Sequence, residues 1–418
     1  MSVPHRILIS LLVLAGIFTL ARFGAAEVLD GQVIDAATGK PIAGATVTVG
    51  EEAASTGAGG QFAINRYGAK IMARAPGYRA VATISADHGS PTLIRLAPFV
   101  PKALYLSFYG IGSKAIRDAA LKTIHEDPGL NAVVIDVKGD RGLVAFKTQV
   151  PLAQAAGAAR ITTIPDMPAL LKELRGQGLY TIARIVVFKD DPLANTRTDL
   201  AVKTADGMIF HDREGLSWTD PFRPEVWDYN VALAVEAAAA GFDEIQFDYV
   251  RFPDAKEARF SEQNTRKSRV AAITGFLTEA RRKLMSYNVF IAVDVFGYVC
   301  WNLDDTGIGQ QLEDIVPLVD YVSPMLYPSG FSFGIPGYPD PMLHPREIVQ
   351  LSLARAVART HISPLRFRPW LQAFKDYAFD HRDFDAGEVK TQIEAAEGVG
   401  TDGWMLWNPR NDYAELGF

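Results

Sequence analysis

The chain has 418 residues, of which 48 % are apolar and 22 % are charged, and this composition is that of a folded globular protein and excludes a disordered chain. Its formal charge of −6 argues against a nucleic acid or an anionic membrane as partner, because both bind basic surfaces. Its single cysteine, Cys300, excludes an intramolecular disulfide and is expected to be a buried packing residue.

Residues 1–26 have the order of a secretory signal peptide. His5 and Arg6 precede an apolar run from Ile7 to Ala21, and small residues follow at 24–26. A run of 15 residues is short for a bilayer span. We therefore expect export to the periplasm or the medium, with an uncleaved anchor and association with the cell envelope as the alternative. Removal of this segment leaves 40 basic and 48 acidic residues, a formal charge of −8.

Residues 27–98 are predicted to form a small β-sandwich. Short alternating runs are separated by turns rich in Gly and Pro, and no helical pattern interrupts them. The predicted strands are VLDGQVID, ATVTV, GQFAIN, KIMARA and TLIRL.

This unit resembles the carboxypeptidase regulatory-like (transthyretin-like) domain. The resemblance rests on Gly31, Val33 and Asp35, on TGKPIAGATV, on Thr56, Gly60 and Phe62, and on APGY at 75–78. It implies an accessory module without catalysis that acts as a spacer or packing partner, with glycan or surface attachment as the alternative.

Residues 99–103 are the predicted linker, and residues 104–418 alternate between strand and helix patterns, which predicts a (β/α)8 TIM barrel. The expected strands are ALYLSF, NAVVIDV, LYTIARIVVF, EIQFDYV, VFIAVDVF, YVSPMLY, RFRPWLQAF and DGWMLWN. The expected helices cover 113–125, 167–177, 226–240, 268–286, 345–359 and 386–397. An open doubly wound sheet is disfavoured because no Gly-rich phosphate turn follows the first strand. The helix after the eighth strand is expected to be missing or reduced, with the sandwich or a long loop over the gap.

The fourth predicted strand carries the most informative acid. Ile245, Phe247 and Tyr249 are expected to point to one side, and Gln246 and Asp248 to the other. A carboxylate at the end of an apolar strand is costly unless it is paired or used, so Asp248 is a candidate for chemistry.

The active site of a TIM barrel lies at the carboxyl ends of its strands, where this sequence places acids, amides and aromatic residues. That combination suits sugars, because rings stack on sugar faces and two carboxyls act on the glycosidic bond. Long loops at 187–225 and 328–345 carry further aromatic residues and are expected to form a groove. Scattered His residues and the lack of a GxSxG motif argue against a metal site and a Ser nucleophile. No cofactor is expected.

Residues 104–413 resemble the glycoside hydrolase-like barrel family DUF4015. The motifs that carry the resemblance are IDVKGDRG, IARIVVFKDDPLA, GFDEIQFDYVRFP, VDVFG, YVSPMLYPSGF, RPWLQAF and GWMLWNP. By its likeness to amylase-type barrels, the family implies Asp248 as nucleophile and Asp294 as general acid, although Glu is usual at the second position. Gln372 stands where amylase-type barrels have a third acid. Asp136 and Glu244 are reserve catalytic candidates. The expected substrate-binding residues are Arg184, Gln246, Arg251, Tyr327, Trp370, Gln372, Trp407 and Asn408.

Each candidate also has a purely structural interpretation. Asp248 could pair with Arg184 or Arg251, Asp294 could cap the following turn, and Asp136 could be a solvated strand end. The aromatic residues could fill the top of the barrel.

Two hypotheses follow. The first is an exported glycoside hydrolase that acts on a polysaccharide or oligosaccharide. The second is a barrel that binds glycan or cell-wall polymer without cleaving it.

Overall fold

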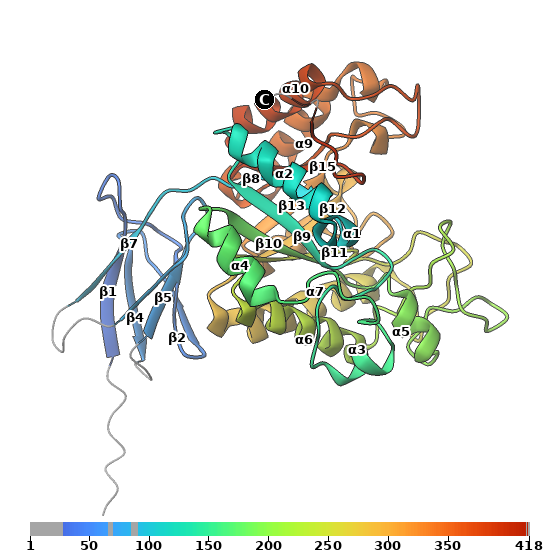
Figure 1. Cartoon of the computed structure of the whole chain (residues 1–418), viewed down its shortest axis with the longest axis horizontal. Coiled ribbons are helices and arrows are strands. Elements are labelled where there is room, and N and C mark those ends of the chain that lie inside the picture. Colours follow the sequence, from blue (N-terminus) through green and yellow to red (C-terminus); the bar gives the residue numbers. More distant parts are fainter. Residues whose placement is uncertain (1–27, 66–69, 85–90, 415, 417–418) are drawn as a thin grey trace, which may run out of the picture.

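A computed structural model describes residues 28–65, 70–84, 91–414 and 416, so the predicted signal peptide lies outside the described residues. None of the helices in these ranges combines the length and hydropathy that crossing a bilayer requires. Figure 1 shows a small all-β unit beside a larger barrel.

The all-β unit consists of two sheets that enclose one core. One sheet has the order β4-β1-β7, in which β1 pairs antiparallel with β4 and parallel with β7, and the other is antiparallel with the order β3-β2-β5-β6. Val33, Val47, Ile71 and Leu96 are buried between them. The strands are β1 (Val28–Asp35), β2 (Thr46–Val49), β3 (Glu52–Ser55), β4 (Gln61–Asn65), β5 (Lys70–Arg74), β6 (Val81–Ile84) and β7 (Thr92–Leu96). The predicted sandwich is confirmed, but the sequence prediction missed β3 and β6, two four-residue strands.

The larger unit is a closed barrel of eight parallel strands in chain order, which confirms the predicted TIM barrel. Its strands are β8 (Lys102–Leu106), β9 (Ala132–Lys138), β10 (Tyr180–Val186), β11 (Glu244–Asp248), β12 (Phe290–Phe296), β13 (Tyr321–Met325), β14 (Trp370–Gln372) and β15 (Trp404–Trp407). Its helices are α1 (Phe108–Gly112), α2 (Lys114–Glu126), α3 (Pro151–Ala155), α4 (Met167–Gly176), α5 (Asp191–Thr196), α6 (Pro224–Ala240), α7 (Arg266–Leu284), α8 (Leu312–Ile315), α9 (Pro345–Thr360) and α10 (Ala386–Val399).

Local sequence explains where the main helices begin and end. Pro224 opens α6, where its missing N–H costs nothing, and Gly241 closes it in the left-handed conformation at φ 112°. Asp385 and Glu388 form a capping box that starts α10, and Gly400 ends it with φ 87°. These signals determine where each helix begins and ends, and therefore where the loops to the neighbouring strand ends lie.

The sandwich docks on the amino-terminal end of the barrel. The Gly77 N–H donates to Asp402 Oδ2 at 3.0 Å, just before β15, and the Arg79 guanidinium donates to the Gly178 carbonyl, just before β10. Arg74 of β5 pairs with Asp320, just before β13, at 3.3 Å. The carboxyl-terminal mouth is therefore left free by the sandwich.

The space beside β8 is covered by the segment that follows β15, and not by the sandwich, which corrects one of the two expectations for that gap. The Tyr413 hydroxyl donates to the Tyr105 carbonyl at 2.8 Å, and Asn411 Nδ2 donates to the same carbonyl at 3.0 Å. This segment thus closes the barrel wall where a further helix would lie.

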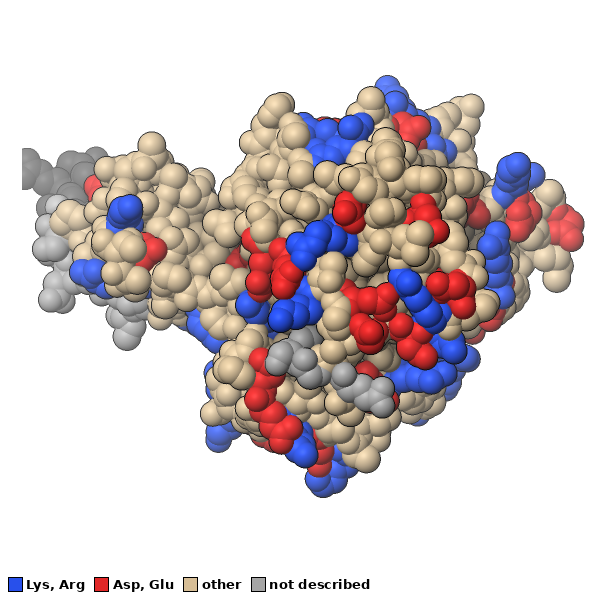
Figure 2. All heavy atoms as spheres, turned by 90° about the horizontal axis from the view of Figure 1, so that it is seen from above, with Lys and Arg blue, Asp and Glu red and all other residues tan. Residues whose placement is uncertain are grey.

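The surface carries charges of both signs. Figure 2 shows acidic and basic side chains interspersed over the barrel, whereas most atoms of the sandwich on that face belong to uncharged residues. The mixture on this face is unlike the continuous basic patch with which proteins bind nucleic acid.

Candidate active site

Asp248 ends β11 at the mouth of the barrel, and the chain turns sharply after it. Tyr249 has a positive φ of 51°, a conformation that is uncommon and strained for a residue with a side chain, so β11 stops one residue before the predicted alternation ends. This turn lets the Tyr249 N–H donate to Asp248 Oδ1 at 2.5 Å. The strain therefore serves to fix one oxygen of the carboxylate.

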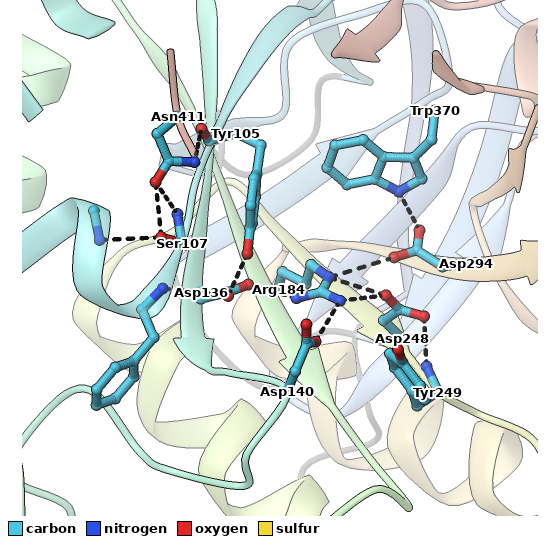
Figure 3. Close-up of polar contacts among 12 residues, drawn as sticks. Tyr105, Ser107, Asp136, Asp140, Arg184, Asp248, Tyr249, Asp294, Trp370 and Asn411 are labelled. Atoms are coloured by element: carbon cyan, nitrogen blue, oxygen red, sulfur yellow. Dashed lines mark hydrogen bonds and ion pairs between the residues drawn. The ribbon is translucent and has the colours of Figure 1, made fainter. Parts of the chain in front are cut away.

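Arg184 of β10 holds the other oxygen of Asp248 and collects further acids around one guanidinium (Figure 3). Its Nε and Nη2 donate to Asp248 Oδ2 at 3.0 and 2.6 Å. Its Nη1 donates to Asp136 at 2.7 Å and its Nη2 to Asp140 at 2.9 Å. Arg184 is buried, and this ion-pair network fixes the positions of carboxylates from β9 and β11.

Asp136 of β9 is buried beneath the mouth. Its Oδ2 accepts hydrogen bonds from the Tyr105 hydroxyl at 2.6 Å and from the Phe108 N–H at 3.3 Å. Burial raises the pKa of Asp136 to about 6, although Arg184 opposes the shift. Asp136 is thus a bonded member of the network and not the solvated strand end that its position in the sequence allowed.

Asp294 of β12 is fully buried next to Asp248. The Trp370 indole donates to Asp294 Oδ1 at 2.9 Å, and Asp294 Oδ2 lies 4.0 Å from Arg184 Nε and has no hydrogen-bond partner among the described residues. Burial, and then the charge of Asp248, raise the pKa of Asp294 well above its usual range. Its surroundings therefore favour the protonated form of Asp294, while Asp248 accepts hydrogen bonds from Arg184 and the Tyr249 N–H.

The carboxyl groups of Asp248 and Asp294 are close together, because one oxygen of each lies near Arg184 Nε. Arg184 Nε lies 3.0 Å from Asp248 Oδ2 and 4.0 Å from Asp294 Oδ2, so these oxygens can be no further apart than the sum of those distances. Two neighbouring carboxyls whose surroundings differ are what acid-assisted cleavage of a glycosidic bond requires.

A pocket of about 400 Å³ opens above Asp248 and has the size of small-ligand sites. Acids and aromatic rings dominate its walls, and Asp294 is not among its lining residues. The lining includes Asp140, Arg184, Asp248, Tyr249, Arg251, Asp254, Phe296, Tyr327, Trp370, Tyr377 and Trp407. Asp248 thus reaches the pocket, whereas Asp294 is buried and bonded to Trp370, which lines it.

The expected substrate-binding residues divide into two groups. Those that line the pocket are Arg184, Arg251, Tyr327, Trp370 and Trp407. Asn408 lines a neighbouring hollow. Gln246 is buried inside the barrel, where its Nε2 contacts Ser323 and Met405, and Gln372 is buried against Ser329 and Gln392. Neither glutamine lines the pocket.

Glu244, a reserve candidate, lies at the amino-terminal end of β11 and is fully buried. Its Oε2 accepts from Arg368 Nη1 at 2.6 Å and from the Tyr180 hydroxyl at 2.9 Å. Because β11 begins at Glu244 and ends at Asp248, the barrel interior separates Glu244 from the mouth. The structure does not bring Glu244 to the site.

Several lining residues were not among the sequence-based candidates. Asp140 stands in the motif IDVKGDRG, but its side chain, 38 % exposed, was not singled out from its neighbours. Tyr249 was expected to point away from Asp248, and only its left-handed backbone brings it to the pocket. Tyr377 lies in a loop for which the sequence offered no signal.

Among the aromatic residues of the two long loops at 187–225 and 328–345, Trp218 is one that approaches the mouth. Its ring lies 5.6 Å from that of Tyr249, and the Arg251 guanidinium lies over it at 4.9 Å. Phe331 is buried in the core instead. Phe333 is 88 % exposed and lines neither the pocket nor the hollows that adjoin it. The described residues contain no group of His, Cys, Asp and Glu arranged to hold a metal ion.

Residues 103–413 match the family model DUF4015, whose description is "Putative glycosyl hydrolase domain". The chain belongs to this family. The match spans the barrel from its first strand to the segment that covers β8, so family membership agrees with the architecture. No curated protein is significantly similar to the chain.

Solved structures that are similar to the chain include a glycoside hydrolase domain. The glycoside hydrolase domain of PgaB (BpsB) from Bordetella bronchiseptica is 16 % identical, with a TM-score of 0.54 over 75 % of this chain and 95 % of that one. A hypothetical protein from Ruminiclostridium thermocellum is 32 % identical, with a TM-score of 0.40 over 46 % of this chain and 97 % of that one. An α-galactosidase from Thermus thermophilus is 15 % identical, with a TM-score of 0.45 over 87 % and 72 %. At 16 % identity, the likeness to the PgaB domain supports the fold of this chain and nothing further.

Proposed function

We propose that this protein is an exported glycoside hydrolase that cleaves glycosidic bonds in a polysaccharide through Asp248 and Asp294. The observation that carries the proposal is the arrangement around Arg184, which bonds Asp248 in the pocket and has Asp294, whose pKa burial raises, next to it. The aromatic lining of the pocket suits the faces of sugar rings.

In the proposed reaction, Asp294 gives its proton to the glycosidic oxygen while the bond to the anomeric carbon breaks. Asp248 either attacks that carbon, to form an ester that water then hydrolyses, or removes a proton from the attacking water. Both routes consume one water and produce two hydroxyl groups. A separation of about 5 to 5.5 Å between the carboxyls corresponds to retention, and one of about 6.5 to 9.5 Å to inversion.

Trp370 controls access to the acid in this proposal. Its indole lines the pocket and hydrogen-bonds Asp294, so Asp294 becomes reachable when substrate shifts the indole. Catalytic contacts often become short only when substrate is bound. Asp140 is the second candidate for the acid, because it already lines the pocket.

The experiment is reducing-end release by the purified chain on a panel that includes starch, galactomannan, chitosan, poly-N-acetylglucosamine and peptidoglycan. Wild type is expected to cleave at least one polymer, and Asp248→Asn is expected to lose at least a thousandfold of that activity, on the order of 4 kcal/mol of transition-state stabilisation. The exposed Asp314→Asn on α8 is the matched control and keeps full activity.

A non-catalytic glycan-binding barrel is the second candidate, and the burial of Asp294, which does not line the pocket, favours it. It predicts that no panel polymer is cleaved while one of them still retards the protein in affinity electrophoresis. That result would replace the hydrolase proposal.

Export is part of the proposal and rests on residues 1–26. Expression of the full chain in a bacterial host, followed by fractionation and N-terminal sequencing, tests it. We expect a mature N-terminus at or near Glu27 in the periplasm or the medium. A chain retained in the cytoplasm with residues 1–26 intact would contradict it.

A further inference from the structure

Two further hollows adjoin the pocket above Asp248. The β14–β15 hollow, of about 650 Å³, is lined mainly from the loops that follow those two strands, including Phe374, Lys375, Tyr377, Asn408 and Arg410, and also by Asp140 and Glu214. The β10–β11 hollow, of about 730 Å³, is lined from the loops that follow β10 and β11, including His211, Arg213, Trp218, Pro253 and Lys256. Each is large enough for a small ligand.

The loops that supply most of the lining of the two hollows face each other across the mouth, and Glu214 lines both hollows. In the closed barrel order, β14 is four strands from β10 and β15 is four strands from β11, so the two loop pairs face each other across the barrel axis. The pocket adjoins both hollows, because it shares Tyr327, Tyr377 and Trp407 with one and Arg251 and Asp254 with the other. Tyr249, the residue after Asp248, lines all three.

The β14–β15 side offers a flat apolar surface. Tyr377 is 61 % exposed, and its ring stacks on Phe374 with centroids 6.1 Å apart and an interplanar angle of 11°. Asp376 fixes this loop, because its carboxylate accepts from the Ser329 hydroxyl at 2.7 Å and from the His381 N–H at 2.9 Å. Although burial opposes it, these hydrogen bonds hold the pKa of Asp376 below its usual range.

The β10–β11 side is also held in place. Lys189 pairs with Asp212 at 3.2 Å and with Glu214 at 2.9 Å, and the Trp218 indole donates to Asp212 at 3.0 Å. The Arg251 guanidinium lies between this hollow and the pocket, over the rings of Trp218 and Tyr249. Both sides of the mouth are therefore built from anchored loops.

We propose that a glycan chain crosses the mouth from the β14–β15 hollow to the β10–β11 hollow, so that Asp248 meets an internal bond and the enzyme is endo-acting. The proposal rests on the proposed function. A site that removes terminal sugars closes around one chain end, whereas this pocket continues on both sides of Asp248.

The test is product analysis on a panel polymer that the wild type cleaves, with viscosity and reducing ends recorded together. Internal cleavage lowers the viscosity while few reducing ends have formed, and it gives oligosaccharides of mixed length from the first time point. Release of one sugar or disaccharide at nearly constant viscosity would overturn this inference and leave the hydrolase proposal intact. No cleavage of any polymer would overturn both.

Variants on the two sides test the path of the chain. Tyr377→Ala and His211→Ala are each expected to lower kcat/KM on the polymer roughly tenfold, the effect of losing one ring contact, with a smaller loss on a trisaccharide. Phe333→Ala, an exposed aromatic outside the three hollows, is the matched control and keeps wild-type kinetics. Equal losses on polymer and trisaccharide in both site variants would contradict the crossing path.

Discussion

The two ends of the barrel each hold a buried arginine surrounded by acids, and they differ in what covers them. At the amino-terminal end, Arg368 bonds Glu244 at 2.6 Å and Asp402 at 3.2 Å, and all three are buried. The sandwich closes this end through Gly77. At the mouth, Arg184 bonds Asp136, Asp140 and Asp248, and the last two line an open pocket.

The difference shows that an arginine with several carboxylates does not by itself identify a site. Glu244 and Asp248 lie on the same strand, four residues apart, and both accept from arginine, yet only Asp248 reaches a pocket. Burial on all sides gives a structural pair, whereas access from one side gives a group that a substrate can reach. The predictions below test this distinction.

The largest expected effect concerns Asp294, which lies at the open end but is as buried as Glu244. If Asp294 is the acid, Asp294→Asn lowers kcat on the polymer by roughly a hundred- to ten-thousand-fold. The loss is small on an aryl glycoside of the same sugar, because a good leaving group does not need the proton. Asn keeps an acceptor for the Trp370 indole, so the change removes the proton and preserves the hydrogen bond.

Asp140→Asn is the matched comparison, because Asp140 is exposed to the pocket. We expect Asp140→Asn to affect both kinds of substrate alike. If the leaving-group dependence appears in Asp140→Asn and not in Asp294→Asn, the acid is Asp140.

The next effect is on stability at the closed end. Glu244→Gln removes the charge that faces Arg368 and leaves a buried guanidinium with a weaker partner, which costs about 3 to 5 kcal/mol. Thermal unfolding is expected to show the loss, while activity per folded molecule stays at the wild-type level. A loss of activity without a loss of stability would return Glu244 to the list of catalytic candidates.

A third prediction concerns the pH dependence of stability through Asp136. Its folded-state pKa of about 6 exceeds the usual value of 3.8, so between these pH values the folded chain keeps a proton that the unfolded chain has lost. The proton that Asp136 keeps in the folded chain therefore contributes roughly 3 kcal/mol to the free energy of unfolding. This contribution is fully present below the usual pKa and is lost as the pH rises to 6. The Tm advantage of wild type over Asp136→Asn should therefore shrink as pH rises from 4 to 7. Parallel Tm curves would contradict the assignment.

Much of the fold could be predicted from sequence because strand and helix periodicities are local. All eight barrel strands were predicted, and Asp248 was found from the cost of an acid in an apolar strand. The alternation on β11 failed at Tyr249, because a positive φ at a residue other than glycine follows from tertiary contacts and has no sequence signal.

The contacts within the site could be predicted only in part. The predicted strand ends placed Arg184, Asp248 and Asp136 together, as the structure does. The sequence could not show that Asp294 bonds Trp370 and does not line the pocket. Gln246 and Gln372 were assigned to substrate by position, whereas their amides bond within the protein. Which atoms face a cavity depends on packing between strands far apart in the chain.

The smallest expected effect lies where the sandwich meets the closed end. Arg74 is buried and bonds Asp320 through Nε alone, and among the described residues its Nη1 and Nη2 have no hydrogen-bond partner. Asp320 Oδ2 also accepts from the Ile291 N–H at 2.9 Å, so it is not left unbonded when the arginine is removed. Because the burial of an incompletely bonded guanidinium is costly, Arg74→Met is expected to change the free energy of unfolding by less than about 1 kcal/mol. Asp320→Ala leaves Arg74 buried without its partner and should lower the free energy of unfolding by more than Arg74→Met does. Thermal melts of the two variants check this. A larger loss for Arg74→Met would mean that this ion pair stabilises the contact between the domains.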